Sequence, residues 1–421
     1  MRSKTVLLAG FMTTAMTALG ASCGGTVTGT GATGTGATGS GGDPSIICTP
    51  NSSRECAGIG CQGNNQVCNA QGTAWSICTC GAGAGPSSSS TSTSTSTSTS
   101  TSSGTGGVDG GMLASPPPAG PMMNPDGTSA VTFAMKKLYL GDTDPDGTPD
   151  KANGWKHFGY NLDGLSSSNL SAFCKTVNNA SPALVHAQGI NGIENSFGHN
   201  IVPILLGVNA STSTEINNAI VSGSYSALFS LDNLGSSASY NALPSHYAEG
   251  GKLGSTPHFD GTDVWPFIQG TNVDLPTAYL TSNTWVSASK ATVTVTLPVM
   301  GAMLDLHLHE AVLTMNLDAA HQNATGGILA GVLSTAELQA QIQALAGSFD
   351  LSLCSGPTIQ SILDQLAQAS DILQDGTQDP TKTCDGITIG LGFDAATVKL
   401  GSSVPPVTHP DPCAPQDAGP G

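Results

Sequence analysis

The stretch 141–150, GDTDPDGTPD, has the spacing that most clearly predicts chemistry in this sequence. Its aspartates alternate with other residues, and Gly147 stands where a calcium-binding loop turns sharply. Calcium takes roughly six to eight oxygen ligands, and alternate carboxylates can wrap around one ion. The alternative is an acidic turn rich in Asp, Pro and Gly. The predicted ligands, counting the backbone carbonyl of the threonine, are Asp142, Asp144, Asp146, Thr148, Asp150 and Asn153.

The register D-x-D-x-D-G-x-x-D, continued through Pro149-Asp150, resembles the calcium loops of thrombospondin type 3 repeats. It also resembles the loop half of dockerins and EF-hands, over about twelve residues. Asn153 stands at the last ligand position, where an acid is usual in these families. The resemblance therefore implies a weak and structural Ca²⁺ site, with a dissociation constant on the order of 10⁻⁴–10⁻³ M.

Three histidines form a second candidate site. His307 and His309 are two residues apart in an alternating strand pattern, so their side chains share one face, and His321 follows twelve residues later. A strand H-x-H pair with a third histidine can bind zinc. Nothing in the spacing forces the third ligand into place. The alternative is a solvent-facing side of the strand, continuous with the threonines of 292–296.

The segment HFDGTDVWPF combines carboxylates with an aromatic residue and is a third candidate. It predicts a polar and aromatic surface for sugar contact, or an acid pair for glycoside hydrolysis. The alternative is a loop of Asx turns beside a buried tryptophan. No nucleophile elbow, H-E-x-x-H pattern or phosphate loop is present, so no catalytic residue is assigned. The candidate ligand-binding residues are His258, Asp260, Asp263 and Trp265.

The elements that must position these residues are expected in a domain over 131–421. Alternating β-branched and leucine residues predict two antiparallel strands within 291–318 that turn near Gly301, and a third strand is expected at 311–317. Shorter strands are expected at 130–141, 224–231 and 387–400. A capping box at Ser334 opens one helix. A second helix is expected from Pro357 to Gly376. This order predicts a mainly β fold with added helices, of the β-sandwich or jelly-roll type.

The domain contains four cysteines, and the second helix lies between two of them. We expect Cys354 to pair with Cys384, and Cys174 with Cys413, which would join the start of the domain to its end. The other two pairings, 174–354 with 384–413 and 174–384 with 354–413, remain open because sequence alone does not determine connectivity.

The N-terminus predicts export. Arg2 and Lys4 precede an uncharged apolar run, and 19–23, LGASC, follows it. This pattern resembles the lipobox of bacterial lipoproteins, although Gly20 stands where leucine is usual. The resemblance implies a signal peptide over 1–22, lipid attachment at Cys23 and delivery to the outer membrane or cell surface. The alternative is cleavage by ordinary signal peptidase near Ala21.

Low-complexity segments separate this signal from the domain. Residues 23–47 and 81–130 are rich in Gly, Thr, Ser and Pro, and we expect disordered tethers there. Between them, 48–80 holds six cysteines and is too short to fold without crosslinks. Together with the lipobox, the Ser/Thr run and the acidic loop, this segment resembles surface lipoproteins of myxobacteria. Its cysteines, expected to form disulfides, are Cys48, Cys56, Cys61, Cys68, Cys78 and Cys80.

The formal net charge of −17 disfavours nucleic acid as a partner and suits cations. We therefore expect a non-enzymatic protein, anchored to the membrane through its lipid. It would carry a structural calcium ion and bind an extracellular polysaccharide or surface protein. Two alternatives stay open, namely a surface hydrolase that uses the histidines or the Asp260/Asp263 pair, and a structural envelope or adhesion protein.

Overall fold

The computed structural model describes residues 53–55, 65–67, 113–120, 123–299, 301–407 and 412–413. The chain forms two compact units, a smaller one within 21–107 and a larger one that contains 108–421. In the smaller unit, β1 (Ser53–Glu55) pairs antiparallel with β2 (Asn65–Val67). The predicted signal peptide, Cys23, the tether over 23–47, the Ser/Thr run and the six module cysteines lie outside the described residues.

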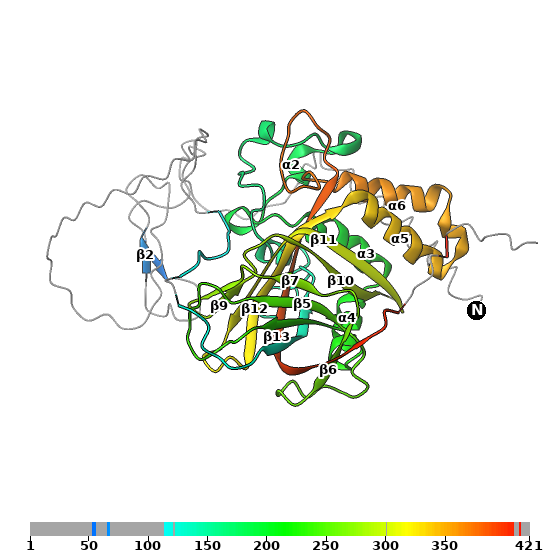
Figure 1. Ribbon diagram of the computed structural model, residues 1–421. Coiled ribbons are helices and arrows are strands. Elements are labelled where there is room, and N and C mark those ends of the chain that lie inside the picture. Colours follow the sequence, from blue (N-terminus) through cyan, green and yellow to red (C-terminus); the bar gives the residue numbers. More distant parts are fainter. Residues whose placement is uncertain are drawn as a thin grey trace, which may run out of the picture. The chain divides into compact units, whose positions relative to one another are not determined.

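The larger unit is mainly β, as predicted, and its described strands form one mixed sheet of eleven with helices beside it (Figure 1). The strands are β3 (Val131–Tyr139), β4 (Ser226–Leu231), β5 (Ser245–Gly250), β6 (Val264–Ile268), β7 (Val273–Leu275), β8 (Tyr279–Thr281), β9 (Thr284–Val286), β10 (Ala291–Val299), β11 (Ala302–Leu317), β12 (Asn323–Ser334) and β13 (Gly386–Val404). The α-helices are α2 (Pro182–Val185), α3 (Val202–Val208), α4 (Thr212–Val221), α5 (Thr335–Phe349) and α6 (Pro357–Gln368). Short 3₁₀ turns and one π-helical turn, η5 (Phe197–Ile201), complete the unit.

Strand β13 joins the two halves of the sheet because it pairs with three others. It is antiparallel to β12 and β3 and parallel to β6. Because β3, β4, β5 and β6 also pair in turn, these strands and β13 close into a ring of five. The ring is filled by its own small apolar cluster, and Trp265 lies inside it with no exposed surface. The indole N–H of Trp265 donates to the Gly251 carbonyl at 2.8 Å, which satisfies its one polar group.

Beyond β13 the sheet continues through β12, β11, β9 and β8, and it folds back over β4 and β5. The main core lies between these layers. Phe229 on β4 stacks on Phe393 of β13 with ring centroids 4.9 Å apart, and it meets Trp285 of β9 edge-on at 6.1 Å. The alternation predicted for β10 and β11 is confirmed, since Val293, Val295, Leu304, Leu306 and Leu308 are all buried here. The separate third strand predicted at 311–317 was wrong, because β11 continues through these residues after a bulge.

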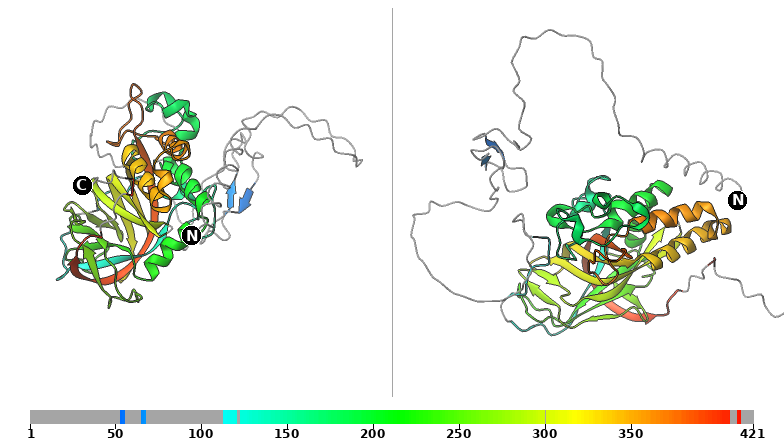
Figure 2. Two further views of the ribbon diagram at one scale, coloured as in Figure 1. Left: turned by 90° about the vertical axis from the view of Figure 1, so that its right-hand side faces the viewer. Right: turned by 90° about the horizontal axis from the view of Figure 1, so that it is seen from above.

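Helices α5 and α6 lie side by side in Figures 1 and 2. Helix α5 begins with the predicted cap, in which the Ser334 hydroxyl accepts the Glu337 N–H. Helix α6 ends at Gln368, not at the predicted Gly376. The prediction of its end was wrong because Ile372 pairs with Gly386 at the start of β13, and this tertiary pairing overrides the helical periodicity. Helices α3 and α4 were not predicted.

The two disulfides of the domain are Cys174–Cys384 and Cys354–Cys413. The pairing expected from the sequence, 354 with 384 and 174 with 413, was wrong, and the structure has the last of the three alternatives. The physical reason is the geometry of α6. Its 12 residues, at about 1.5 Å each, hold the end that carries Cys354 well away from the start of β13, where Cys384 lies.

The linker predicted over 81–130 is ordered in its last part. Residues 113–120 and 123–130 run along the domain in an extended conformation. Ala114 exchanges backbone hydrogen bonds with Asn191 at 2.7 Å and Asn161 at 2.8 Å, and the Tyr279 hydroxyl donates to the Pro117 carbonyl. A proline-rich segment has no internal hydrogen bonds, so its carbonyls are free to accept such donors. The expected disorder is therefore wrong for these residues.

A buried asparagine attaches the region between β3 and β4 to the sheet. Asn195 has no exposed surface, and its amide nitrogen lies within hydrogen-bonding distance of three carbonyls, of Trp155, Phe158 and Gly390. Its amide oxygen accepts the N–H groups of Gly198 and Gly390 at 2.9 and 3.0 Å. One side chain thus satisfies backbone groups from three separate segments of the chain.

We expect Asn195→Ala to lower the free energy of unfolding by about 3 kcal/mol, because it leaves several buried backbone groups without partners and each costs roughly 1–3 kcal/mol. Urea unfolding followed by tryptophan fluorescence measures the change. The control is Asn218→Ala, at an exposed position of α4, which should stay within about 0.5 kcal/mol of wild type. Equal stability of the two variants would contradict this role of Asn195.

Candidate functional site

The outer face of β11 carries the group of polar side chains that is the best candidate for a functional site. Asp305, His307 and His309 point away from the core there, because they alternate with the buried leucines of the same strand. Beside them on β10, Thr294 pairs with His307 and Thr296 pairs with Asp305. The structure therefore brings the two histidines onto one face, next to the row of threonines.

The two histidines share one carboxylate partner, Glu337. The His309 Nε2 lies 2.9 Å from Glu337 Oε2, and the His307 Nδ1 lies 3.8 Å from the same oxygen. Glu337 is in the first turn of α5, where the capping box of Ser334 holds the backbone. The capping box predicted where α5 begins and that Glu337 lies in its first turn. It did not predict that α5 packs against β11 and brings Glu337 to the histidines.

His321 lies apart from this pair. It follows β11 in a turn, has only 5% of its surface exposed, and places Nδ1 2.8 Å from the Gly235 carbonyl. Its left-handed backbone, with φ of 51°, belongs to that turn. The predicted three-histidine set of His307, His309 and His321 is therefore not brought together. Within the described ranges, no group of three or more His, Cys, Asp or Glu side chains is arranged to hold a metal ion.

A polar pocket of about 390 Å³ opens beside His309, between β11 and the segment that precedes β13. One wall is formed by Glu310, which the plain strand alternation would place on the opposite face from His309. A β-bulge between His309 and Val312 breaks the alternation, and Glu310 has a left-handed φ of 52°. The residues that line the pocket are Thr292, His309, Glu310, Leu373, Gln374, Asp375, Lys382 and Asp385.

The other wall is the segment 371–385, which the Cys174–Cys384 disulfide ties to the body of the domain. Gly376 turns this wall with a φ of 75° and lies close to Glu310 and Lys290. Within the wall, the Gln374 N–H donates to Asp385 Oδ1 at 2.8 Å. The wall is therefore a defined loop held by covalent and hydrogen bonds.

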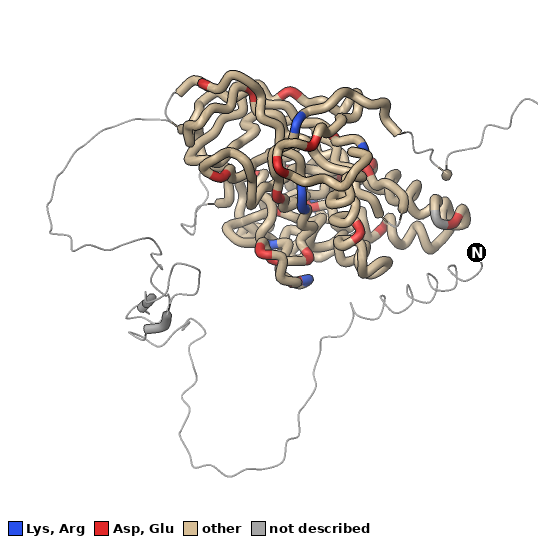
Figure 3. Tube along the Cα trace, turned by 90° about the horizontal axis from the view of Figure 1, so that it is seen from below, with Lys and Arg blue, Asp and Glu red and all other residues tan. Residues whose placement is uncertain are grey.

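The pocket is negatively charged overall. Glu310, Asp375 and Asp385 face one lining lysine, Lys382, and the Lys290 Nζ lies 3.1 Å from Glu310 Oε2 at the rim. The hydrogen bond from the Thr377 hydroxyl holds the pKa of Asp375 below its usual value, and Lys382 adds to this effect. Figure 3 shows acidic residues spread over the fold with few lysines or arginines among them. An anionic ligand would be repelled here.

The polar face continues from the pocket, along β10, to a pair of acids, of which Glu249 is buried and Asp305 is half-buried. The Thr296 Oγ1 lies 2.6 Å from Glu249 Oε1 and 2.7 Å from Asp305 Oδ1. A hydroxyl has one proton to donate, so it serves only one of the two carboxyl groups at a time. Burial raises the pKa of Glu249. Glu249 was not predicted, because it comes from β5, far away in the sequence.

The surface predicted around HFDGTDVWPF is not formed. Trp265 lies inside the five-stranded ring and cannot stack on a ligand. Asp263 accepts the backbone N–H groups of His258 and Phe259, at 2.9 and 2.7 Å. Asp260 Oδ1 accepts the backbone N–H of Thr262 at 3.0 Å. This prediction was wrong because burial of the large apolar ring in the core is more favourable than its exposure, and the segment is the alternative loop of Asx turns.

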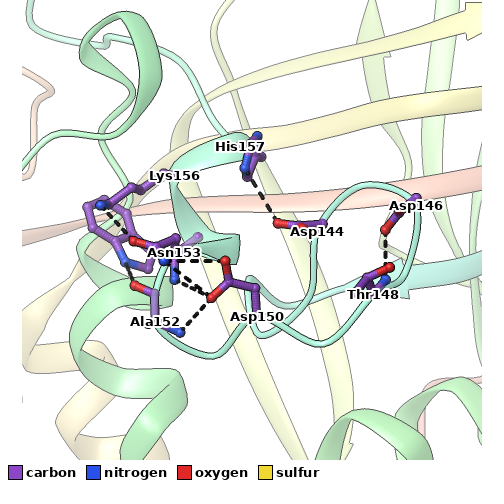
Figure 4. Close-up of polar contacts among 9 residues, drawn as sticks. Asp144, Asp146, Thr148, Asp150, Ala152, Asn153, Lys156 and His157 are labelled. Atoms are coloured by element: carbon purple, nitrogen blue, oxygen red, sulfur yellow. Dashed lines mark hydrogen bonds and ion pairs between the residues drawn. The ribbon is translucent and has the colours of Figure 1, made fainter. Parts of the chain in front are cut away.

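The acidic loop forms a small hairpin in which Thr143 pairs with Pro149. Its carboxylates point to different partners, as Figure 4 shows. Asp144 Oδ1 lies 3.5 Å from His157 Nε2, while Asp146 accepts the Thr148 N–H at 2.8 Å.

At the two ends of the loop, Asp142 accepts the Ser213 hydroxyl at 2.7 Å, and Asp150 accepts the N–H groups of Ala152 and Asn153. The N–H of Thr148 lowers the pKa of Asp146, and the N–H groups of Asn153 and Ala152 lower the pKa of Asp150. The carboxylates do not converge in this conformation, so calcium stays a prediction and its binding would require the loop to rearrange.

No protein-family model, curated protein or solved structure matches this chain. Among the described residues, none of the helices has the length and apolar character needed to cross a bilayer. The candidate site therefore rests on its own geometry.

The calcium prediction has a direct test. At 10 mM CaCl₂, a site with a dissociation constant near 10⁻³ M would stabilise the fold by about 1.4 kcal/mol and raise the melting temperature by a few degrees. Differential scanning calorimetry with CaCl₂ and with EDTA measures this shift. The variant Asp144→Asn/Asp146→Asn should lose it. Asp379→Asn, which alters an Asx turn of the same kind at Thr381, should keep it. An identical midpoint with and without calcium in wild type would contradict the prediction.

Proposed function

We propose that this protein is an exported, lipid-anchored surface protein whose larger unit binds an extracellular ligand rich in hydroxyl groups, such as a neutral polysaccharide. The observation that carries the proposal is the polar pocket beside His309, which continues along β10 and β11 as a polar strand face. An elongated ligand would lie along this face, with its end or one of its residues in the pocket.

The chemistry of the lining favours hydroxyl groups over charged anions. Three carboxylates and the Gln374 amide oxygen accept hydrogen bonds, while Lys382 and the amide nitrogen donate them. Sugar hydroxyls both donate and accept, so they match this mixture. Phosphate, nucleic acid and uronic acid polymers would meet the excess negative charge.

Binding without catalysis fits the contacts of the histidines better than hydrolysis does. Among the described side chains, the hydrogen-bond partner of His309 is Glu337, and no Ser, Thr or Cys side chain is bonded to either His307 or His309. A nucleophilic hydrolase needs a nucleophile and its base within hydrogen-bonding reach. The hydrolase and the purely structural protein stay as alternatives, which the binding experiment separates from the proposal.

We expect wild-type protein to bind a neutral polysaccharide such as dextran or amylose and not alginate, in isothermal titration calorimetry. His309→Ala or Asp375→Asn should weaken binding about tenfold, because a hydrogen bond to a charged or strongly polar partner contributes roughly 1.5 kcal/mol. His246→Ala is the control, since this histidine lies on β5 between Asp232 and Asp274. Binding of no neutral polysaccharide, or equal affinity of all variants, would overturn the assignment to this pocket.

The disulfides support export, because such crosslinks persist in oxidising compartments. For the lipid anchor, we expect Cys23→Ser to move the protein from the membrane pellet to the soluble fraction after expression in a bacterial host. The control Ser22→Ala keeps a small residue before the cysteine and should stay in the pellet. Membrane retention of the Cys23→Ser variant in the presence of high salt would contradict lipid attachment.

A further inference from the structure

A group of oxygen atoms lies where side chains of β5 meet the outer edge of β10. Among the described strands β10 pairs only with β11, so the backbone groups on its other edge have no strand partner. Two side chains of β5 satisfy them. The Tyr247 hydroxyl donates to the Thr294 carbonyl at 2.6 Å, and Glu249 Oε1 accepts the Thr296 N–H at 3.0 Å. The Glu249 carboxyl is therefore held in place against β10.

The Asp305 carboxyl of β11 contacts the same threonine. Thr296 and Asp305 are direct partners across β10 and β11, and the Thr296 Oγ1 lies 2.6 Å from Glu249 Oε1 and 2.7 Å from Asp305 Oδ1. The hydrogen bonds of both carboxyls are donated to them by Thr296, so the geometry suits two ionised acceptors. One hydroxyl proton is thus shared between two carboxylates.

No basic side chain balances the charge of this pair. Among the described residues, lysine and histidine form ion pairs with other carboxylates, and neither Glu249 nor Asp305 takes part in one. Glu249 is only 5% exposed, so water screens its charge poorly. Two carboxylates on one hydroxyl therefore concentrate negative charge that a positive ion would stabilise.

A buried tyrosine hydroxyl without a partner points toward the same group. Tyr225 directly precedes β4, is 3% exposed, and its Oη has no hydrogen-bond partner among the described residues. The hydroxyl is close to the two carboxylates, since burial and then the charge of Glu249 raise the pKa of Tyr225, and Asp305 adds to this effect. Buried polar groups normally have a partner, and a ligand between the carboxylates would supply one.

We propose that Glu249, Asp305, Thr296 and Tyr225 bind one hard divalent cation, Ca²⁺ or Mg²⁺. The two carboxylates balance the charge of such an ion. Together with the two hydroxyls they offer about six oxygen atoms, a ligand set that suits these ions and not zinc or copper. Thr296 and Asp305 are half-buried, which gives the ion a path from solvent. The bound ion joins β5 to β10 and β11.

The spacing of the oxygens is close to what the ion needs. Ion–oxygen distances of about 2.1–2.5 Å place neighbouring ligands roughly 3 Å apart. The carboxylate oxygens lie 2.6 and 2.7 Å from the Thr296 hydroxyl, so these ligands have to separate by only a few tenths of an ångström. The hydroxyl then binds the ion through a lone pair and turns its proton away.

The test titrates CaCl₂ and MgCl₂ separately into the EDTA-treated full chain at about pH 7.5, with isothermal titration calorimetry. The parent is the Asp144→Asn/Asp146→Asn variant, so that the acidic loop does not contribute to the heat. We expect one bound ion with a dissociation constant on the order of 10⁻⁴–10⁻³ M, as in other extracellular sites. Binding of either cation supports the site, and the two titrations show which one it prefers.

Three further substitutions in this parent identify the ligands. Asp305→Asn and Glu249→Gln should each weaken binding roughly tenfold or more, because each removes a charged ligand. Tyr225→Phe should weaken it by roughly fivefold, because it removes a neutral ligand. In EDTA this variant should melt at the temperature of the parent, since the hydroxyl has no protein partner to lose. Glu215→Gln, at an exposed carboxylate of α4, is the matched control and should bind as the parent does.

Hydrogen exchange locates the ion. We expect the bound cation to slow exchange of the Thr296 amide severalfold in the parent and not in the Asp305→Asn variant, with no change at Leu329 of β12. If one carboxyl variant does not fold, the other still decides the question. Absence of divalent-cation binding in the parent, or equal affinity of the parent and both carboxyl variants, would overturn the site. These measurements contain no polysaccharide, so failure to bind polysaccharide would affect only the proposed function.

Discussion

The structure depends on the close contact between the Glu194–Asn195–Ser196 tripeptide and β13. Three consecutive polar residues are buried there, and their hydrogen bonds reach Thr388 and Gly390 of β13 and the carbonyl of Ala369. Between β3 and α3 the chain forms one four-residue helix and short 3₁₀ and π-helical turns, so it satisfies few of its backbone groups by itself. A buried side chain such as that of Asn195, with both donors and acceptors, supplies the missing partners.

The contact also requires glycine on β13. A Cβ atom at Gly390 would lie 2.2 Å from the Phe158 carbonyl oxygen, and one at Gly392 would lie 2.2 Å from the Phe158 ring. Both distances are far shorter than any van der Waals contact. The absence of side chains at these two positions lets an irregular segment lie directly on a central strand. The Ser196 hydroxyl of the same segment donates to the Ala369 carbonyl, just before the pocket wall, so the wall is positioned by this contact as well.

The sequence predicted best those features whose partners are close along the chain. The alternation around Leu304 and Leu306 and the cap at Ser334 depend on local periodicity and on one turn of helix, and both were confirmed. The end of α6, the disulfide pairing and the inward position of Trp265 depend on where distant segments meet, and these predictions failed. Period-two patterns also place a residue on a face only while the strand is regular. Because of the bulge at Glu310, the strand pattern did not predict that this residue forms one wall of the pocket. The histidines contact Glu337 of helix α5, and not His321 as predicted.

Strand β13 has a consequence for the order in which the protein can assemble. It follows every other described strand along the chain, yet β3 and β12 each have one edge that it alone covers. During synthesis, or during passage across a membrane from the N-terminus, both edges stay uncovered until residues near 400 emerge. Uncovered strand edges recruit other chains, and long-range pairing of this kind is slow. Nascent molecules would therefore need a chaperone or another form of shielding through most of elongation, and a chain released before β13 would lack the strand that joins its two halves.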